Sequence, residues 1–161
     1  MVDNELFAAI ERQFPKTKII QPADINLDDC EKPRTPPGLI EGDFNGDGRT
    51  DYAVLLKGKV KRETKWKGKI LKLMDVKFVV FLREKDNKLR SILIESIEDY
   101  HPFIIGLGIV QPGIVHETPA SGDKQATLIH PGVVKYHCGK FADVFYWDDK
   151  MKRFDSIRVS D

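Results

Sequence analysis

Short β-type runs separated by turn residues are the feature that most constrains the fold of this chain. Four runs rich in β-branched and aromatic residues lie at 18–20, 52–56, 78–82 and 92–94. A further pair, 142–147 and 154–159, is separated by a polar turn and is typical of a β-hairpin. Because consecutive runs are joined by short links, we expect an antiparallel sheet of about five to eight strands.

One amphipathic helix is expected before these runs. Its apolar residues recur at helical spacing at Leu6, Phe7, Ile10 and Phe14. Pro15 cannot continue the helix. The sequence therefore predicts an α+β fold over residues 1–161, a single domain with an N-terminal helix packed on an antiparallel β-sheet built from hairpins.

Length and charge limit the classes of protein to which the chain can belong. Its 161 residues, 41% of them hydrophobic, suffice for one domain with its own core. The net charge of +1 offers no global argument for a nucleic-acid or membrane partner. No apolar run approaches the roughly 20 residues that cross a bilayer, so we expect no membrane span. The first residues also lack the cationic and apolar regions of an export signal.

Oxygen-bearing side chains are concentrated in residues 43–51. They occupy relative positions 1, 3, 5 and 9 of this segment, at Asp43, Asn45, Asp47 and Asp51. Calcium takes about six to eight oxygen ligands, which a short segment supplies by curling round the ion. Gly48 at position 6 permits the backbone reversal, and the carbonyl of Arg49 at position 7 is the natural main-chain ligand, with its side chain facing water. Three carboxylates this close would repel one another without a cation, so we expect Ca²⁺ here.

The segment differs from a helix-loop-helix calcium site on its C-terminal side. Val54 stands where such a site has a bidentate glutamate, and the residues after Asp51 form an apolar β-type run, so the loop should join two strands. In the form Gly-Asp-x-Asn-Gly-Asp-Gly-x-x-Asp it resembles the calcium loop of FG-GAP and VCBS-type repeats, known from integrin α-chain propellers. The resemblance implies ion ligands from the side chains of Asp43, Asn45, Asp47 and Asp51 and from the carbonyl of Arg49.

The resemblance does not extend to the propeller architecture, because the motif occurs once in this chain. The C-terminal pattern also resembles the tail of small bacterial proteins with a single such loop, many of which are exported. Without the bidentate glutamate, the expected dissociation constant is weak, about 10⁻⁴ to 10⁻³ M, as in extracellular modules. This favours a periplasmic or secreted protein over the alternative of a cytoplasmic one.

An ion-free turn is the alternative interpretation of residues 43–51, since Asn-Gly and Asp-Gly are turn formers. A turn needs one or two such residues and does not need aspartate at positions 1, 5 and 9 together. We therefore predict a metal-binding loop.

A basic segment lies at residues 57–72, with eight lysines and arginines against the single acid Glu63. Together with Trp66 it offers a surface for an anionic polymer, either nucleic acid or glycan. Most of its lysines, however, lie at odd positions, as on the solvent face of a β-hairpin. We therefore expect a solvated basic hairpin and no nucleic-acid partner.

Cysteine and histidine placement does not indicate a specific chemistry. Cys30 and Cys138 leave a disulfide and two free thiols as open alternatives. The histidines lack zinc-ligand spacing. A catalytic set requires a free choice among Ser96, Asp99, His101 and His137, so we expect no enzyme.

These observations predict a non-catalytic, exported, calcium-stabilised binding or interaction module whose partner is a protein or a glycan. An inhibitor or immunity protein for a secreted toxin or hydrolase is one concrete form. Two alternatives stay open. One is a hydrolase with an unrecognised active site, which a pocket lined by His101 or His137 beside carboxylates would favour. The other is an anionic-polymer binder acting through the basic hairpin 57–72.

Overall fold

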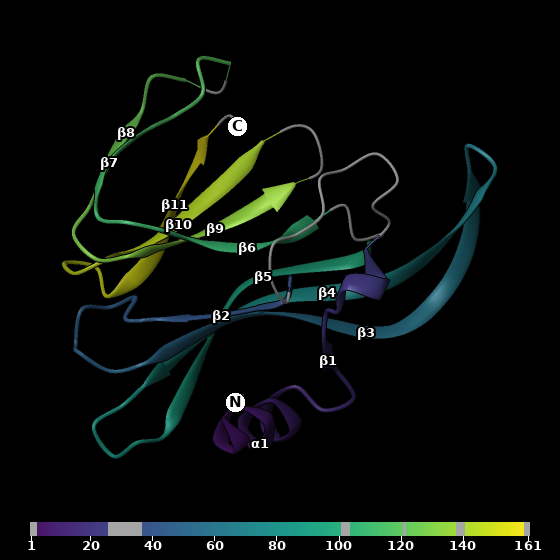
Figure 1. Cartoon of the computed structure of the whole chain (residues 1–161), viewed down its shortest axis with the longest axis horizontal. Coiled ribbons are helices and arrows are strands. Elements are labelled where there is room, and N and C mark those ends of the chain that lie inside the picture. The colour runs from purple at the N-terminus through teal and green to yellow at the C-terminus, as the bar shows by residue number, and fades with distance from the viewer. Residues whose placement is uncertain (1–2, 26–36, 101–103, 121, 138–140, 160–161) are drawn as a thin grey trace.

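The computed structural model describes residues 3–25, 37–100, 104–120, 122–137 and 141–159 (Figure 1). Within these residues the chain forms one α-helix, one short 3-10 helix and eleven strands. In chain order they are α1 (Asn4–Gln13), β1 (Lys18–Ile19), η1 (Pro22–Asp24), β2 (Leu39–Gly42), β3 (Asp51–Trp66), β4 (Lys69–Arg83), β5 (Leu89–Tyr100), β6 (Ile104–Val110), β7 (Gly113–His116), β8 (Gln125–Leu128), β9 (Gly132–His137), β10 (Ala142–Asp148) and β11 (Arg153–Val159). No helix among the described residues is long and apolar enough to cross a membrane.

The strands divide into two larger sheets and a small hairpin. The first sheet has the order β1-β3-β4-β5, with β2 also paired to β3, and the second has the order β11-β10-β9-β6. Strands β7 and β8 pair with each other, and every pairing among the described residues is antiparallel. Helix and antiparallel strands confirm the coarse α+β prediction, here mostly β. The prediction of one sheet of about five to eight strands was wrong, because alternation identifies strands and does not assign them to sheets.

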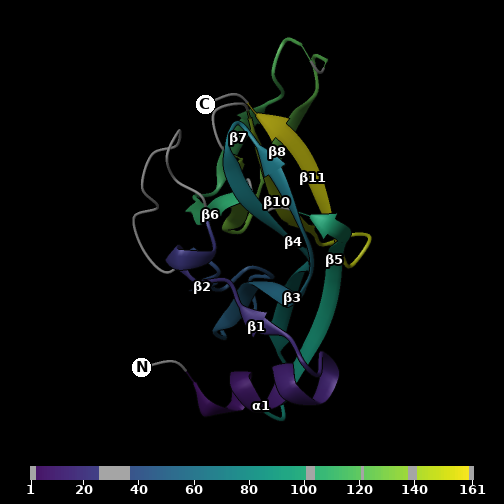
Figure 2. The ribbon, with the colours of Figure 1, turned by 90° about the vertical axis from the view of Figure 1, so that its right-hand side faces the viewer.

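Apolar cores lie on both faces of the first sheet. On one face, Phe78 of β4 packs edge-on against Phe145 of β10, with ring centroids 5.0 Å apart. On the other face, Leu6 and Ile10 of α1 pack against Phe81 of β4. Figures 1 and 2 show the resulting order of layers, with the helix on one side of the first sheet and the second sheet on the other. Because both faces are covered there, residues 52–56 of β3 and 78–82 of β4 are apolar at every position.

The helix is tied to the first sheet at its N-terminus. Its cap is Asp3, whose carboxylate accepts a hydrogen bond of 2.9 Å from the backbone N–H of Glu5. The helix ends before Phe14, as the following Pro15 predicts. At the end of β4 the guanidinium of Arg83 donates to Asp3 at 2.5 Å and to Glu5 at 2.6 Å. One arginine of the sheet thus binds both acids at the start of the helix.

Strands β3 and β4 continue beyond the first sheet as a two-stranded projection. Strand β1 pairs with β3 no further than Lys57, and β5 pairs with β4 from Met74 onward, so the residues between are paired only with each other. The projection ends in a two-residue turn at Lys67 and Gly68, both with positive φ. The projection is curved (Figure 1), and the register shifts on either side of Val60 account for this, because β-bulges bend a two-stranded ribbon. We call residues 59–72 the basic arm.

The basic arm confirms the predicted hairpin but not its predicted one-sided exposure. All residues from 59 to 70 are exposed, on both faces of the ribbon. One-sided exposure was wrong because the arm extends beyond the strands that flank β3 and β4, so neither of its faces is covered from residue 59 to residue 70.

Candidate metal centre

The 43–51 loop connects β2 to β3, as its sequence predicts. Gly42 and Asp51 form the last cross-strand pair before the chain leaves the ladder. Just after this pair, Phe44 is fully buried in the core between the two sheets. A side chain at Gly42 would come within 2.9 Å of the Phe44 ring, so a glycine is needed for this close approach. The loop therefore starts from a fixed point, and its other residues are partly or fully exposed up to Thr50.

Backbone N–H groups curl round the carboxylate of Asp43. Its two oxygens accept hydrogen bonds from the N–H groups of Asp47 at 3.0 Å and Gly48 at 2.8 Å. The amide oxygen of Asn45 also accepts from Asp47, at 3.1 Å, and Asp47 accepts from the N–H of Arg49, at 3.0 Å. Gly48 adopts φ +81°, consistent with the backbone reversal expected there. The side-chain turns of the ion-free alternative are thus present in the loop.

Asp51 lies beneath the loop and is fully buried. Its carboxylate accepts backbone hydrogen bonds from Phe44 at 3.0 Å and from Arg83 at 2.9 Å. Burial raises the pKa of Asp51 to about 6, because these two hydrogen bonds only partly offset the desolvation. The negative charges of Asp47 and Asp43 raise this pKa further. Asp43 and Asp47 therefore act electrostatically on Asp51.

Arg49 occupies a place that the sequence did not predict. Its guanidinium forms an ion pair with the carboxylate of Asp47 at 2.8 Å, whereas we expected the side chain to face water. The side-chain amide of Asn45 donates to the same Asp47 oxygen at 3.3 Å. A cation bound in the loop would therefore compete with Arg49 for Asp47.

The loop has the types of oxygen ligand that calcium prefers, but these oxygens are not arranged round a common point. Carboxylate, amide and carbonyl oxygens are the ligands that this hard ion prefers. Within the described residues, however, no group of three or more His, Cys, Asp or Glu side chains is placed so that it could hold a metal ion. The oxygens of Asp43 and Asp51 bond to backbone N–H groups, and Asp47 bonds to Arg49. All five residues of the predicted site thus lie in one loop, with the acidic oxygens bound to hydrogen-bond donors.

A histidine in the connection between β8 and β9 packs against this loop. A Cβ atom at Gly46 would lie 2.1 Å from Cε1 of His130, so the ring lies directly over the glycine. His130, in the connection between β8 and β9, is in turn bonded through Nε2 to Asp149 at 2.7 Å. No motif in the sequence links residues 46, 130 and 149, because their contact depends on how the sheets stack. The loop is thereby packed against the β8–β9 connection.

A second polar cluster, also not foreseen, joins the two sheets. Lys135 of β9 is only 2% exposed and pairs with Glu95 of β5, across the sheet interface. Asp143 of β10 lies 3.9 Å from Lys135 and accepts a hydrogen bond of 2.9 Å from Arg158. Its second oxygen lies 3.2 Å from Nε2 of His137. This cluster supplies the partners that a buried lysine requires.

The charges of this cluster determine how Asp143 ionises. Burial by itself would raise the pKa of Asp143. The hydrogen bonds from His137 and Arg158 and the positive charges of Arg158 and Lys135 outweigh burial and lower the pKa to about 2. Asp143 is therefore ionised in the folded protein at all but strongly acidic pH.

The residues considered for catalysis have separate partners. Ser96 accepts from Lys77 at 3.3 Å, Asp99 pairs with Arg62 at 3.6 Å, and His137 contacts Asp143. His101, Cys30 and Cys138 lie outside the described residues. The pocket with His101 that would favour a hydrolase, and the choice between a disulfide and two free thiols, therefore stay open. His137 does lie beside a carboxylate, but that carboxylate is already bound by Arg158.

Comparisons with known proteins give no match: no family model, no curated protein and no solved structure matches this chain. The resemblance to FG-GAP and VCBS-type loops therefore depends on residues 42–54 alone and stays a prediction.

Proposed function

We propose that this protein is a non-catalytic, exported binding module whose 43–51 loop is stabilised by calcium. The ion is held by the side chains of Asp43, Asn45, Asp47 and Asp51 and by the carbonyl of Arg49. It displaces the Arg49 guanidinium from Asp47 and neutralises the repulsion among the three carboxylates. The partner is a protein or a glycan, as for an inhibitor or immunity protein directed at a secreted toxin or hydrolase.

The observation that carries the proposal is the concentration of acidic side chains round a short curled backbone. The carboxylate of Asp43 is enclosed by the N–H groups of Asp47 and Gly48. Asp51 is buried below, within electrostatic range of both Asp43 and Asp47. The positive side chain that pairs with this set, Arg49, is partly exposed. A divalent cation would compensate the remaining negative charge more completely than Arg49 does.

A weak site of this kind is suited to a structural role. With about 2 mM calcium and a dissociation constant near 0.1 mM, linkage gives about 1.8 kcal/mol of stabilisation. For a chain of this length, that corresponds to a rise of about 4 to 7 °C in melting temperature. Such a loop would be calcium-loaded outside the cell and empty at cytosolic calcium levels.

Thermal unfolding in calcium and in a chelator tests the proposal. We expect the melting temperature of the wild-type protein to rise by about 4 to 7 °C in millimolar calcium. Asp47→Asn should abolish this rise, because it removes one charged ligand while leaving an oxygen to accept the Arg49 N–H. Asp123→Asn, an exposed acid outside the loop, is the matched control and should keep the rise. If calcium raises the melting temperature of all three proteins equally, it binds outside the 43–51 loop. If calcium does not change the melting temperature of the wild type, the site is excluded.

The binding role needs a separate measurement. Immobilised wild-type protein should retain a partner from an extract of the native host in calcium and release it into a chelator. Asp47→Asn should retain less of the same partner under identical conditions. If the same amount of partner is retained with calcium or chelator and by either protein, the 43–51 loop does not shape the binding surface.

A further inference from the structure

The tip of the basic arm exposes apolar side chains on both faces of the ribbon. Trp66 is 44% exposed and Ile70 is 61% exposed. The register pairs Trp66 with Lys69 and Lys65 with Ile70. Because directly opposed residues of an antiparallel pair share a face and neighbours along a strand alternate, Trp66 and Ile70 lie on opposite faces. Each face of the tip therefore carries one large apolar residue and one lysine.

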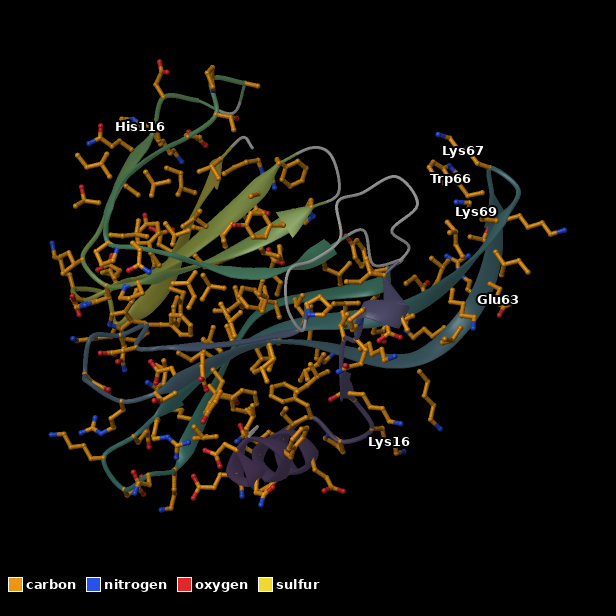
Figure 3. The ribbon with its side chains drawn as sticks, in the orientation of Figure 1. Lys16, Glu63, Trp66, Lys67, Lys69 and His116 are labelled. Atoms are coloured by element: carbon orange, nitrogen blue, oxygen red, sulfur yellow. The ribbon has the colours of Figure 1, made fainter. Side chains whose placement is uncertain are left out.

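Acidic side chains pair with the basic residues at the base of the arm. Near the base, Lys61 pairs with Asp75 at 2.8 Å and Arg62 with Asp99 at 3.6 Å. Toward the tip, Lys65 forms no ion pair with any residue that the structure describes. The ammonium of Lys67 lies 4.5 Å from the centre of the Trp66 ring. In Figure 3, Trp66, Lys67 and Lys69 gather at the end of the arm, beyond Glu63.

We propose that the tip of the basic arm binds end-on to an anionic lipid surface. Trp66 and Ile70 enter the interfacial region from the two faces of the ribbon, while Lys65, Lys67 and Lys69 contact headgroup phosphates. Tryptophan prefers the interface between headgroups and acyl chains. Lysines near an anionic bilayer each add to the attraction, and their aliphatic stems cover apolar surface while the charge stays in water.

A lipid surface fits this tip better than a nucleic acid does. A two-stranded ribbon that enters a DNA groove presents one face to the base edges and leaves the other face in water. That arrangement would leave either Trp66 or Ile70 exposed without a contact. An end-on approach to a plane uses both faces at once, and the arm projects from the body of the molecule as this approach requires (Figure 1).

Vesicle flotation in the presence of a chelator tests the proposal, since calcium then cannot bridge acids to lipid. The wild-type protein should float with vesicles that contain phosphatidylglycerol and not with pure phosphatidylcholine, and high salt should release it. The charge reversal Lys65→Glu with Lys67→Glu should lower the partition coefficient at least about tenfold. Lys85→Glu with Lys150→Glu makes the same change in net charge at two other hairpin turns and should leave binding unchanged.

The apolar contribution is tested by Trp66→Ala and Ile70→Ser, each of which should weaken binding to the same vesicles. Emission of Trp66 should also shift to shorter wavelength on binding, whereas Trp147, only 9% exposed, should give a constant background. Melting curves must show that all variants fold. Absence of binding to phosphatidylglycerol vesicles, or equal loss in the arm and control variants, would overturn the proposal. Binding to a duplex oligonucleotide without binding to vesicles would overturn it in favour of a nucleic-acid partner.

Discussion

Two glycines of the 43–51 loop have the same backbone conformation and different surroundings. Gly46 has φ +74° and lies under the His130 ring, whereas Gly48 has φ +81° and open space at its Cβ position. Gly48→Ala should therefore cost about 1 kcal/mol, from left-handed strain alone. Gly46→Ala should cost about 1 to 3 kcal/mol more, because the methyl group collides with the imidazole. Chemical denaturation of the two variants measures both costs.

The double variant Gly46→Ala with His130→Ala identifies the source of the extra cost. Removal of the ring should recover most of the difference between the two glycine variants, as a double-mutant cycle would report. If the additional cost persists without the ring, the loop does not pack on His130.

Arg49 competes with any cation for the carboxylate of Asp47. Removing it by Arg49→Ala should strengthen calcium binding by about 1.4- to fivefold, since a partly exposed ion pair contributes only about 0.2 to 1 kcal/mol. Titration calorimetry measures the change. Arg90→Ala, which breaks the exposed pair with Glu84, is the charge-matched control and should leave the affinity unchanged. Weaker binding by Arg49→Ala would mean that the arginine supports the site.

Within the element formed by β9, β10 and β11, acid sensitivity should centre on Asp143. Its pKa is lowered from 3.8 to about 2 by the groups that face it, Lys135 and His137 on β9 and Arg158 on β11. An acid with a depressed folded-state pKa stabilises the protein above its unfolded pKa and loses that contribution as the pH falls toward the folded value. About 2 kcal/mol should therefore be lost between about pH 4 and pH 2.

Denaturation across pH 2 to 5 measures this loss, with Asp143→Asn as the test and Asp123→Asn as the control. Asp143→Asn should flatten the pH dependence and lower stability at neutral pH, because Lys135 and Arg158 then lose a charged partner. Asp123→Asn should keep the wild-type slope. If the slopes of all three proteins coincide, Asp143 is not the group that titrates.

Several individual strands were predictable from the amino-acid sequence. The predicted runs at 52–56 and 78–82 lie inside β3 and β4, and the hairpin closed near residue 150 is β10 with β11. Local alternation and turn residues suffice for these elements. The division into two sheets was not predictable, because it depends on which apolar faces meet. The unbroken apolar runs at 52–56 and 78–82 are the local sign that both faces of these parts of β3 and β4 are covered.

For the candidate site, too, the sequence predicted local features and not contacts between distant segments. Spacing alone placed Asp43, Asn45, Asp47 and Asp51 in one strand-connecting loop. It could not indicate that His130 packs on the loop or that Lys135 is buried. His130 is more than 80 residues distant along the chain, and a lysine such as Lys135 is expected at the surface unless a partner across the sheets is known. Calcium binding and export stay predictions.

Across the whole molecule, Arg83 connects three distant parts of the chain. Its N–H group binds Asp51 below the loop, and its guanidinium binds Asp3 and Glu5 at the start of α1. Calcium binding in the 43–51 loop should therefore slow amide exchange in the first turn of α1. Mass-spectrometric exchange on the wild type and on Arg83→Lys would check this, with the effect reduced in the variant. The N-terminal turn of the helix would then report ion binding in a loop that lies far from it along the chain.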